Sequence, residues 1–217
     1  RPVGYSRAGL VTIGTTNHEL DNQFNVVRQD LLKSGAVEEA ALSSSPTTAI
    51  HNNRSDVTWS GKDPAMAGDF ANVRVTTEFG KTVGWQFTDG RDFSTKFITD
   101  STAVILNEAA VKYMGLKNPV GQMINFGRNH TNHRVIGVIK DMVMESPYEP
   151  AKQTLFYIDK SDFDAITIRI NPHMSAHEAI GKIAAVCKKY APSVPFAYSF
   201  VDDDYAKKFP TEESIGK

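Results

Sequence analysis

The chain has 217 residues, of which 41% are apolar and 23% are charged, and its formal net charge is −1. This length and composition are ordinary for a globular protein that buries a core of its own. A net charge this close to zero excludes the strongly basic surface that binding to nucleic acid or to an anionic membrane would require. Because Cys187 is the single cysteine, an intrachain disulfide is excluded as well, and we interpret Cys187 as a small core residue.

The first part of the chain predicts a strand, a helix and a second strand. Residues 10–14 and residues 37–43 are β-rich runs. Between them a helical pattern begins near Leu20, and Gly35 is placed to end it. The apolar stripe of this helix consists of Phe24, Val27, Leu31 and Leu32. The three elements together are typical of a βαβ-like unit.

Loops and two further strands are predicted up to residue 77. Residues 43–48 and 51–55 have the composition of loops. Residues 57–59 predict a short strand, closed by a turn at residues 61–64. Apolar and polar residues alternate over residues 70–77, which predicts a long strand with one face toward solvent.

The middle of the chain predicts short elements separated by glycines. Residues 103–106 form a strand that leads directly into a helix over residues 108–114. Asn107 is placed to cap this helix, and Gly115 is placed to end it.

Four more strands follow in chain order. Residues 122–126 and 134–139 predict a hairpin whose turn covers residues 127–132. Residues 154–158 predict a strand, and residues 165–170 predict another with clean alternation of apolar and polar residues.

The last predicted helix has a well-defined start and end. Ser175 and Glu178 have the spacing of a capping box, and the helical pattern continues to about Tyr190 before Pro192 ends it. Residues 196–200 predict the final strand. A strand-helix-strand unit therefore occurs near each end of the chain. We expect the two units to pair in one sheet with helices on one face, around a smaller β-rich insert, which is an α+β fold.

Gly80-Lys81-Thr82 looks like the end of a phosphate-binding loop. The full motif requires a glycine five residues before Gly80, where this chain has Val75, and a glycine-rich stretch that is also missing. The backbone N–H groups that would hold a phosphate are therefore not expected to converge here, and the sequence predicts no nucleotide site.

Histidine and aspartate clusters do not complete a metal site. His173 and His177, and likewise His130 and His133, lack acidic or cysteine partners at zinc-site spacing, and we interpret all four as surface residues. The run at residues 202–204 has three aspartates but not the alternating ligands, glycine and distal glutamate of an EF-hand loop. We interpret it as the start of a helix, where acidic residues are favourable.

Other candidate features have simple structural interpretations. Asn53 and Asn129 begin glycosylation patterns, which occur often by chance. No nucleophile–base signature of a hydrolase occurs, and the sequence predicts no catalytic, cofactor-binding or metal-binding residues. Several large aromatics are assigned to the core, with a pocket or a partner contact as the alternative role. They are Trp59, Phe70, Trp85, Phe87 and Phe93.

Three blocks of sequence recur in this order in one protein family. They are residues 84–93 (GWQFTDGRDF), 100–118 (DSTAVILNEAAVKYMGLKN) and 134–141 (RVIGVIKD), and residues 198–205 (YSFVDDDY) add a fourth. Together they resemble the extracytoplasmic domain of MacB/FtsX-like ABC transporter permeases, the MacB-type periplasmic core domain. The resemblance is closest to members of the Bacteroidetes type.

The resemblance implies a two-lobed fold. A porter-like lobe is expected to contain the two outer strand-helix-strand units, in residues 1–77 and 153–217. A β-rich Sabre-like lobe, residues 78–152, is expected to be inserted between them.

The resemblance also implies a non-catalytic domain without cofactors that couples cytoplasmic ATP hydrolysis to conformational change in the periplasm, for export or signalling. The implied partners are a second permease subunit, a cytoplasmic ABC ATPase and, in some members, a periplasmic adaptor protein, but no nucleic acid. Because both ends of the chain look cut, we expect an excised, monomeric piece. In the whole protein, flanking transmembrane helices would tether it to the periplasmic face of the bacterial inner membrane.

Two other classes of function remain as alternatives. A ligand-sensing extracytoplasmic domain of a membrane receptor would need a defined pocket with convergent polar groups. A soluble hydrolase would need a nucleophile–base pair.

Overall fold

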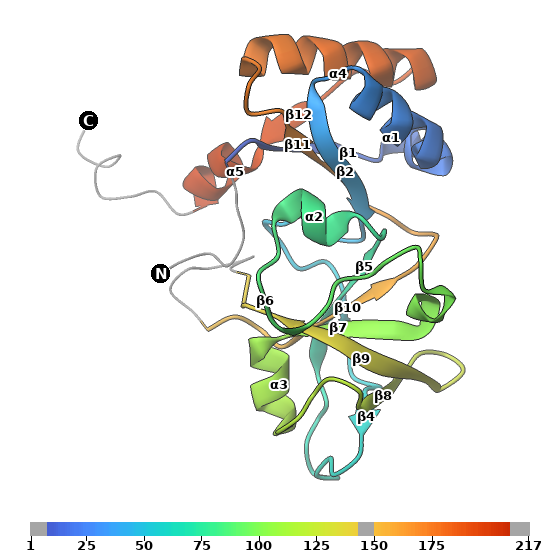
Figure 1. Cartoon of the computed structure of the whole chain (residues 1–217), viewed down its shortest axis with the longest axis vertical. Coiled ribbons are helices and arrows are strands. Elements are labelled where there is room, and N and C mark those ends of the chain that lie inside the picture. The colour runs from blue at the N-terminus through green and yellow to red at the C-terminus, as the bar shows by residue number, and fades with distance from the viewer. Residues whose placement is uncertain (1–7, 143–149, 209–217) are drawn as a thin grey trace, which may run out of the picture.

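The computed structural model describes residues 8–142 and 150–208. The strands are β1 (Leu10–Gly14), β2 (Val37–Ser43), β3 (Asn53–Arg54), β4 (Thr58–Trp59), β5 (Phe70–Val75), β6 (Phe87–Gly90), β7 (Ala103–Asn107), β8 (Met123–Phe126), β9 (Thr131–Ile139), β10 (Thr154–Ile158), β11 (Ala165–Ile170) and β12 (Tyr198–Phe200). The α-helices are α1 (Phe24–Lys33), α2 (Phe79–Val83), α3 (Glu108–Met114), α4 (Ala176–Tyr190) and α5 (Val201–Lys208). The strands form one 12-stranded sheet with the order β12-β1-β11-β2-β5-β10-β7-β9-β8-β4, and β3 and β6 attach to β5 and β9. The chain is therefore an α+β protein, as predicted (Figure 1).

The upper half of the molecule consists of β1, α1, β2, β11, α4, β12 and α5. β11 lies between β1 and β2 and is antiparallel to both, so β1 and β2 are parallel to each other across it. In the same way β1 separates β11 from β12. The two strand-helix-strand units are thus interlocked in one sheet, and α1 and α4 cover the same face of it (Figure 1). This arrangement confirms the predicted pairing of the two outer units.

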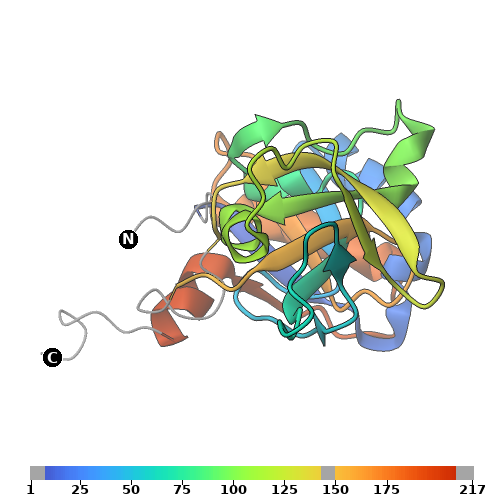
Figure 2. The same ribbon diagram turned by 90° about the horizontal axis from the view of Figure 1, so that it is seen from below.

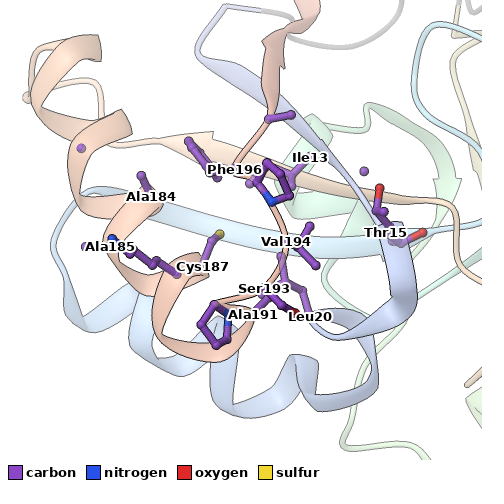
Figure 3. Close-up of a pocket in the computed structure, with 17 residues that line it drawn as sticks. Ile13, Thr15, Leu20, Ala184, Ala185, Cys187, Ala191, Ser193, Val194 and Phe196 are labelled. Carbon is purple, nitrogen blue, oxygen red and sulfur yellow. The ribbon is translucent and has the colours of Figure 1, made fainter.

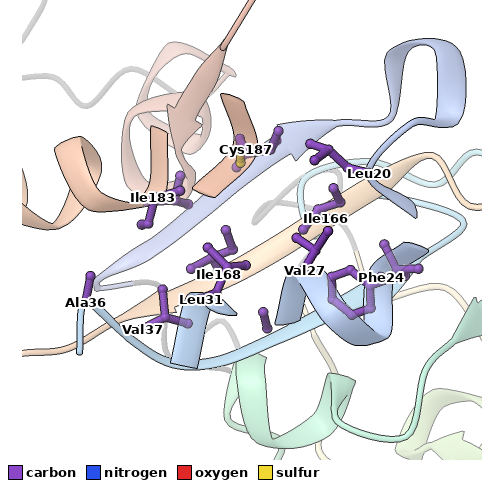
Figure 4. Close-up of a cluster of buried hydrophobic side chains, with 14 of the residues drawn as sticks. Leu20, Phe24, Val27, Leu31, Ala36, Val37, Ile166, Ile168, Ile183 and Cys187 are labelled. Carbon is purple, nitrogen blue, oxygen red and sulfur yellow. The ribbon is translucent and has the colours of Figure 1, made fainter. Parts of the chain in front are cut away.

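Apolar side chains from both units form the core beneath these helices (Figure 4). α1 contributes Val27 and Leu31 to this core and α4 contributes Ile183 and Cys187, and all four are at most 5% exposed. Cys187 is therefore a buried core residue, as predicted. Ser175 caps α4 as predicted, because its hydroxyl accepts a hydrogen bond from the backbone N–H of Glu178 at 3.2 Å.

The lower half contains the elements from β3 to β10. Asn107 ends β7 and caps α3, since its side-chain oxygen accepts from the backbone N–H of Ala110 at 2.9 Å and from that of Thr154 at 3.0 Å. Gly115 ends the helix with a φ of 69°. The predicted hairpin is confirmed as the antiparallel pair β8–β9, although β9 already begins at Thr131. Figure 2, which looks at this half from below, shows β9 in yellow beside β7 in green, with which it pairs in parallel.

The two halves are connected at a region that we call the joint, which consists of the β2–β5 pair and of α2. In the sheet, β2 meets β5 through the single pair Ser43 and Val75, which is extended by a hydrogen bond from the Thr76 N–H to the Leu42 carbonyl at 3.1 Å. Below the upper sheet, α2 packs against the face that α1 and α4 leave open (Figure 1). The helix was not predicted, because a five-residue segment does not form a helix alone. Burial of Phe79 and Val83, at 1% and 0% exposure, stabilises it.

One predicted surface pattern was wrong. The alternation in β5 predicted one solvent-exposed face, yet five of its six residues are buried. Val73 and Val75 belong to the core at the joint, while Phe70 packs into the core of the lower half, so both faces are covered. β11 is similarly buried on both faces, between α1 and α4 on one side and α2 on the other. Alternation along a strand shows which side chains are polar, but it does not show which elements pack on each face of the strand.

The division into lobes at residues 77/78 and 152/153 stays a prediction. The sheet runs on across both places, since β10 pairs with β5 on one side and with β7 on the other. Among the described residues, no helix is long and apolar enough to cross a membrane.

Candidate binding pocket and charged clusters

A pocket of about 580 Å³ opens in the upper half, between α4, the end of β1 and the loop that follows α4 (Figure 3). Ile13 and Leu20 contribute to one side, Ala184 and Cys187 to another, and Val194 comes from the loop. The segments that meet here lie more than 160 residues apart in the sequence, so the pocket is a product of the interlocked fold. The complete lining is Ile13, Gly14, Thr15, Thr16, Leu20, Gly181, Ala184, Ala185, Cys187, Lys188, Ala191, Pro192, Ser193, Val194, Pro195, Phe196 and Ala197.

The lining is mainly apolar, and its polar groups are largely committed elsewhere. The Thr15 hydroxyl donates to the Phe163 carbonyl at 3.0 Å, and the Ser193 hydroxyl donates to Glu19 Oε1 at 2.9 Å. Burial raises the pKa of the Cys187 thiol to about 11, so it stays protonated and unreactive at neutral pH. The pocket is therefore suited to binding and not to nucleophilic catalysis.

A second cluster fixes an exposed loop in the lower half. Arg91 makes a bidentate ion pair with Asp100, with both N···O distances at 2.9 Å, and the Ser94 N–H donates to the same carboxylate at 2.8 Å. Burial of Asp100 opposes its ionisation, but these donors lower its pKa below the usual range. The Arg91 guanidinium also lies 4.2 Å from the centre of the Phe97 ring. The loop is thus held in place while Ile98 is 90% exposed.

Asp92 lies at the joint, in buried surroundings that disfavour its negative charge. Its Oδ2 atom packs so closely on α2 that a Cβ atom added to Gly80 would lie 2.3 Å away. Burial raises the pKa of Asp92 to about 6, although a hydrogen bond from the Phe93 N–H at 2.7 Å and the charge of Lys81 act in the opposite direction. The ionised form is therefore disfavoured in the folded protein.

We expect Asp92→Asn to stabilise the protein at neutral pH and not at pH 4. The folded-state pKa is about 6 and the ordinary value is 3.8, so the folded state holds the proton more tightly. Stability is then fully retained below about pH 4 and falls as the pH rises to about 6. Asn at this position does not ionise, so the variant should be about 3 kcal/mol more stable than the parent protein at pH 7. Urea unfolding of both proteins at pH 4 and pH 7 checks this, and a pH-independent difference would contradict it.

The histidines do not gather into a site, and one of them was misjudged. His173 and His177 are exposed at the start of α4, and His130 lies in the β8–β9 turn. His133, predicted to be on the surface, is only 8% exposed. Its ring stacks on Phe126 with the ring centres 3.8 Å apart, and this burial lowers its pKa. Within residues 8–142 and 150–208, no group of three or more His, Cys, Asp or Glu side chains could hold a metal ion.

The other candidate residues have structural roles. Gly80-Lys81-Thr82 lies inside α2, where the Thr82 N–H is bonded to the Glu78 carbonyl at 3.0 Å. Residues 202–204 form the first turn of α5, as predicted, and Asp204 accepts a hydrogen bond from Ser199 at 2.7 Å. Asn53 lies in β3, and Asn129 lies in the β8–β9 turn.

The aromatic residues form the core, as predicted. Trp59, Phe70, Trp85 and Phe93 are at most 9% exposed, and Phe87 is partly buried beside them.

The chain is similar to a family of known domains. The sequence model of the MacB-like periplasmic core domain matches residues 4–186. No curated protein matches the chain. Among solved structures, the periplasmic region of MacB from Actinobacillus actinomycetemcomitans is 16% identical, with a TM-score of 0.64 over 94% of each chain.

Two other solved structures share the fold. The extracellular domain of the noncanonic ABC-type transporter YknZ from Gram-positive bacteria is 15% identical, with a TM-score of 0.54 over 87% of this chain and 98% of that chain. A domain from Porphyromonas gingivalis, described as part of a permease, is 13% identical, with a TM-score of 0.53 over 83% of this chain and 82% of that chain.

Proposed function

Because the chain belongs to the family of MacB-like periplasmic core domains, we propose that it is a mechanical element of an ABC transporter permease, which moves as one body when a cytoplasmic ATPase binds and hydrolyses ATP. ATP favours one state of the permease dimer over another, and the outer domains follow the membrane helices. The domain itself carries out no reaction. The motion acts on a substrate or on a partner in the periplasm.

The observation that carries this proposal is the apolar core at the joint. Leu10 and Ala41 from the underside of the upper sheet share one buried cluster with Phe79 and Val83 of α2 and with Phe156 of the lower half. Parts of a chain that share a large apolar interface do not move independently. A close-packed core also transmits strain with little loss. A displacement applied to one half therefore reaches the other half undiminished.

The proposed partners follow from the family. They are a second copy of the permease, a cytoplasmic ABC ATPase and, in some systems, a periplasmic adaptor, with the domain tethered at the periplasmic face of the inner membrane. The family match favours this assignment over a receptor domain, because it covers residues 4–186.

Arg169→Ala is expected to weaken the coupling between the halves. Arg169 on β11 donates from Nε to the Thr82 carbonyl at the end of α2, at 2.7 Å, and from Nη1 to the Ala8 carbonyl at 2.8 Å. In the full-length permease, spin labels at Lys117 of the two copies, in the lower half, should report a change in distance on adding ATP. The buried thiol of Cys187 reacts slowly and does not interfere.

We expect Arg169→Ala to reduce this ATP-dependent change while ATP hydrolysis continues. Arg134→Ala is the matched control, because Arg134 is exposed and its side chain donates to the nearby Gly121 carbonyl at 3.3 Å. An unchanged response in both variants would argue against transmission through α2. No response to ATP in the unmodified permease would remove the proposed function.

A further inference from the structure

We propose that the pocket between α4 and the end of β1 binds a small amphiphile, with its apolar body inside the cavity and an anionic group at Lys188. This site goes beyond the mechanical function and does not depend on it. Its volume of about 580 Å³ falls within the range of about 300–1,000 Å³ that is usual for small-molecule sites.

The walls of the pocket are fixed before any ligand arrives. Ile13 belongs to a central strand and Cys187 to the buried face of α4, and they are 4% and 5% exposed. The loop over the cavity contains Pro192 and Pro195, whose rings restrict φ, and a turn in which the Val194 N–H donates to the Ala191 carbonyl at 3.2 Å. A preformed cavity lowers the entropic cost of binding.

The side chains that line the cavity favour a ligand whose main part is apolar. Leu20, Ala184, Val194 and Phe196 face the cavity (Figure 3), together with small groups of α4 that leave room beside the helix. The chain contains no charged residue from Ala191 to Val201, although 23% of all its residues are charged. An apolar ligand would cover this surface without leaving a buried polar group unpaired.

The charge at the pocket selects the head group. Lys188 is the single charged residue of the lining. Its neighbour Lys189 is paired with Asp30 at 3.0 Å, and Lys182 donates to the Ser34 carbonyl at 3.4 Å. Lys188, in contrast, makes no ion pair or hydrogen bond with any residue that the structure describes. It is free to pair with a carboxylate, sulfate or phosphate group of the ligand.

Two dyes that differ by one charge test both parts of the proposal. 1-Anilinonaphthalene-8-sulfonate carries a sulfonate, and N-phenyl-1-naphthylamine has the same rings without it. We expect both to bind to the 217-residue chain at one saturable site. Ala184→Phe, which fills the cavity, should weaken the binding of both dyes by about tenfold or more, the effect of losing a well-packed contact. Ala176→Phe, an exposed position on the same helix away from the lining, is the matched control.

Lys188→Ala should weaken binding of the sulfonate dye by roughly two- to fivefold, the range for one exposed ion pair. Binding of the uncharged dye should stay the same. Lys189→Ala should leave the binding of both dyes unchanged, because Lys189 is outside the lining of the pocket. Non-saturable binding, or equal effects of Ala184→Phe and Ala176→Phe, would overturn the proposal.

Discussion

Trp85→Ala is expected to destabilise the domain by about 3–5 kcal/mol, the range for removing a large aromatic side chain from a core. Trp85 is 9% exposed and lies at the centre of the joint. Its ring contacts those of Phe79, Phe93 and Phe156, with ring centres 5.6, 6.5 and 4.9 Å away. Its indole N–H also points at the sulfur of Met142, at 3.1 Å. Alanine would leave a cavity between α2 and the lower half.

Urea unfolding at pH 7 measures this loss. Trp85→Phe keeps most of the packing and should cost about 1–2 kcal/mol, in line with a moderate reduction in core volume. Phe97→Ala serves as a control, because Phe97 is 48% exposed and its truncation should change stability by less than about 1 kcal/mol. If Trp85→Ala cost no more than Phe97→Ala, the joint would not be a packed core.

Gly137→Ala should have a comparably large effect, at about 3 kcal/mol or more, since its added methyl group meets backbone atoms that cannot move aside. Gly137 on β9 lies directly opposite Gly90 on β6. A Cβ atom at Gly137 would lie 2.4 Å from the Arg91 carbonyl oxygen, and one at Gly90 would lie 2.1 Å from the Ile136 carbonyl oxygen. Gly90 also has a φ of 66°, which side chains other than glycine rarely adopt.

Gly181→Ala is the matched control for this substitution. A Cβ atom there meets nothing within 4 Å, and Gly181 lies inside α4. The same change should therefore stabilise the protein by about 0.5–1 kcal/mol, through helix propensity. Thermal and urea unfolding compare the two variants. A Gly137→Ala protein as stable as the parent would mean that β6 does not pack on β9 as described.

The close pairing of Gly90 with Gly137 connects two of the blocks that carry the family resemblance. Two of the blocks that carry it, residues 84–93 and 134–141, contain one of these glycines each. Because neither strand could approach the other with a side chain in between, the two blocks depend on each other structurally.

Elements with local signals were predicted well. β2 and β10 have the predicted limits, and α3 begins after Asn107 and ends before Gly115 as its caps indicated. Such signals depend on neighbouring residues and are therefore visible in the sequence. The helix α1 begins at Phe24 and not near Leu20, because short 3₁₀ turns precede it.

Features that depend on distant packing were not predicted. α2 is a helix because Phe79 and Val83 are buried against the upper sheet, and His133 is buried because it stacks on Phe126. The pocket was not predicted either. Cys187 was correctly assigned to the core, but the cavity beside it forms only where α4 meets β1 and the loop after α4 in the fold. The uncharged run from residue 191 to residue 201 was the one signal in the sequence that could have pointed to it.

The central claim is that the domain moves as a single body, and two distances in the full-length permease test it most directly. A spin-label pair at Lys182 and Lys117, both exposed, spans the upper and lower halves of one copy. Labels at Lys182 in both copies span the dimer. We predict that ATP binding shifts the distance between copies by several ångströms and leaves the distance within one copy unchanged. A changed distance within the copy, with a constant distance between copies, would contradict the account.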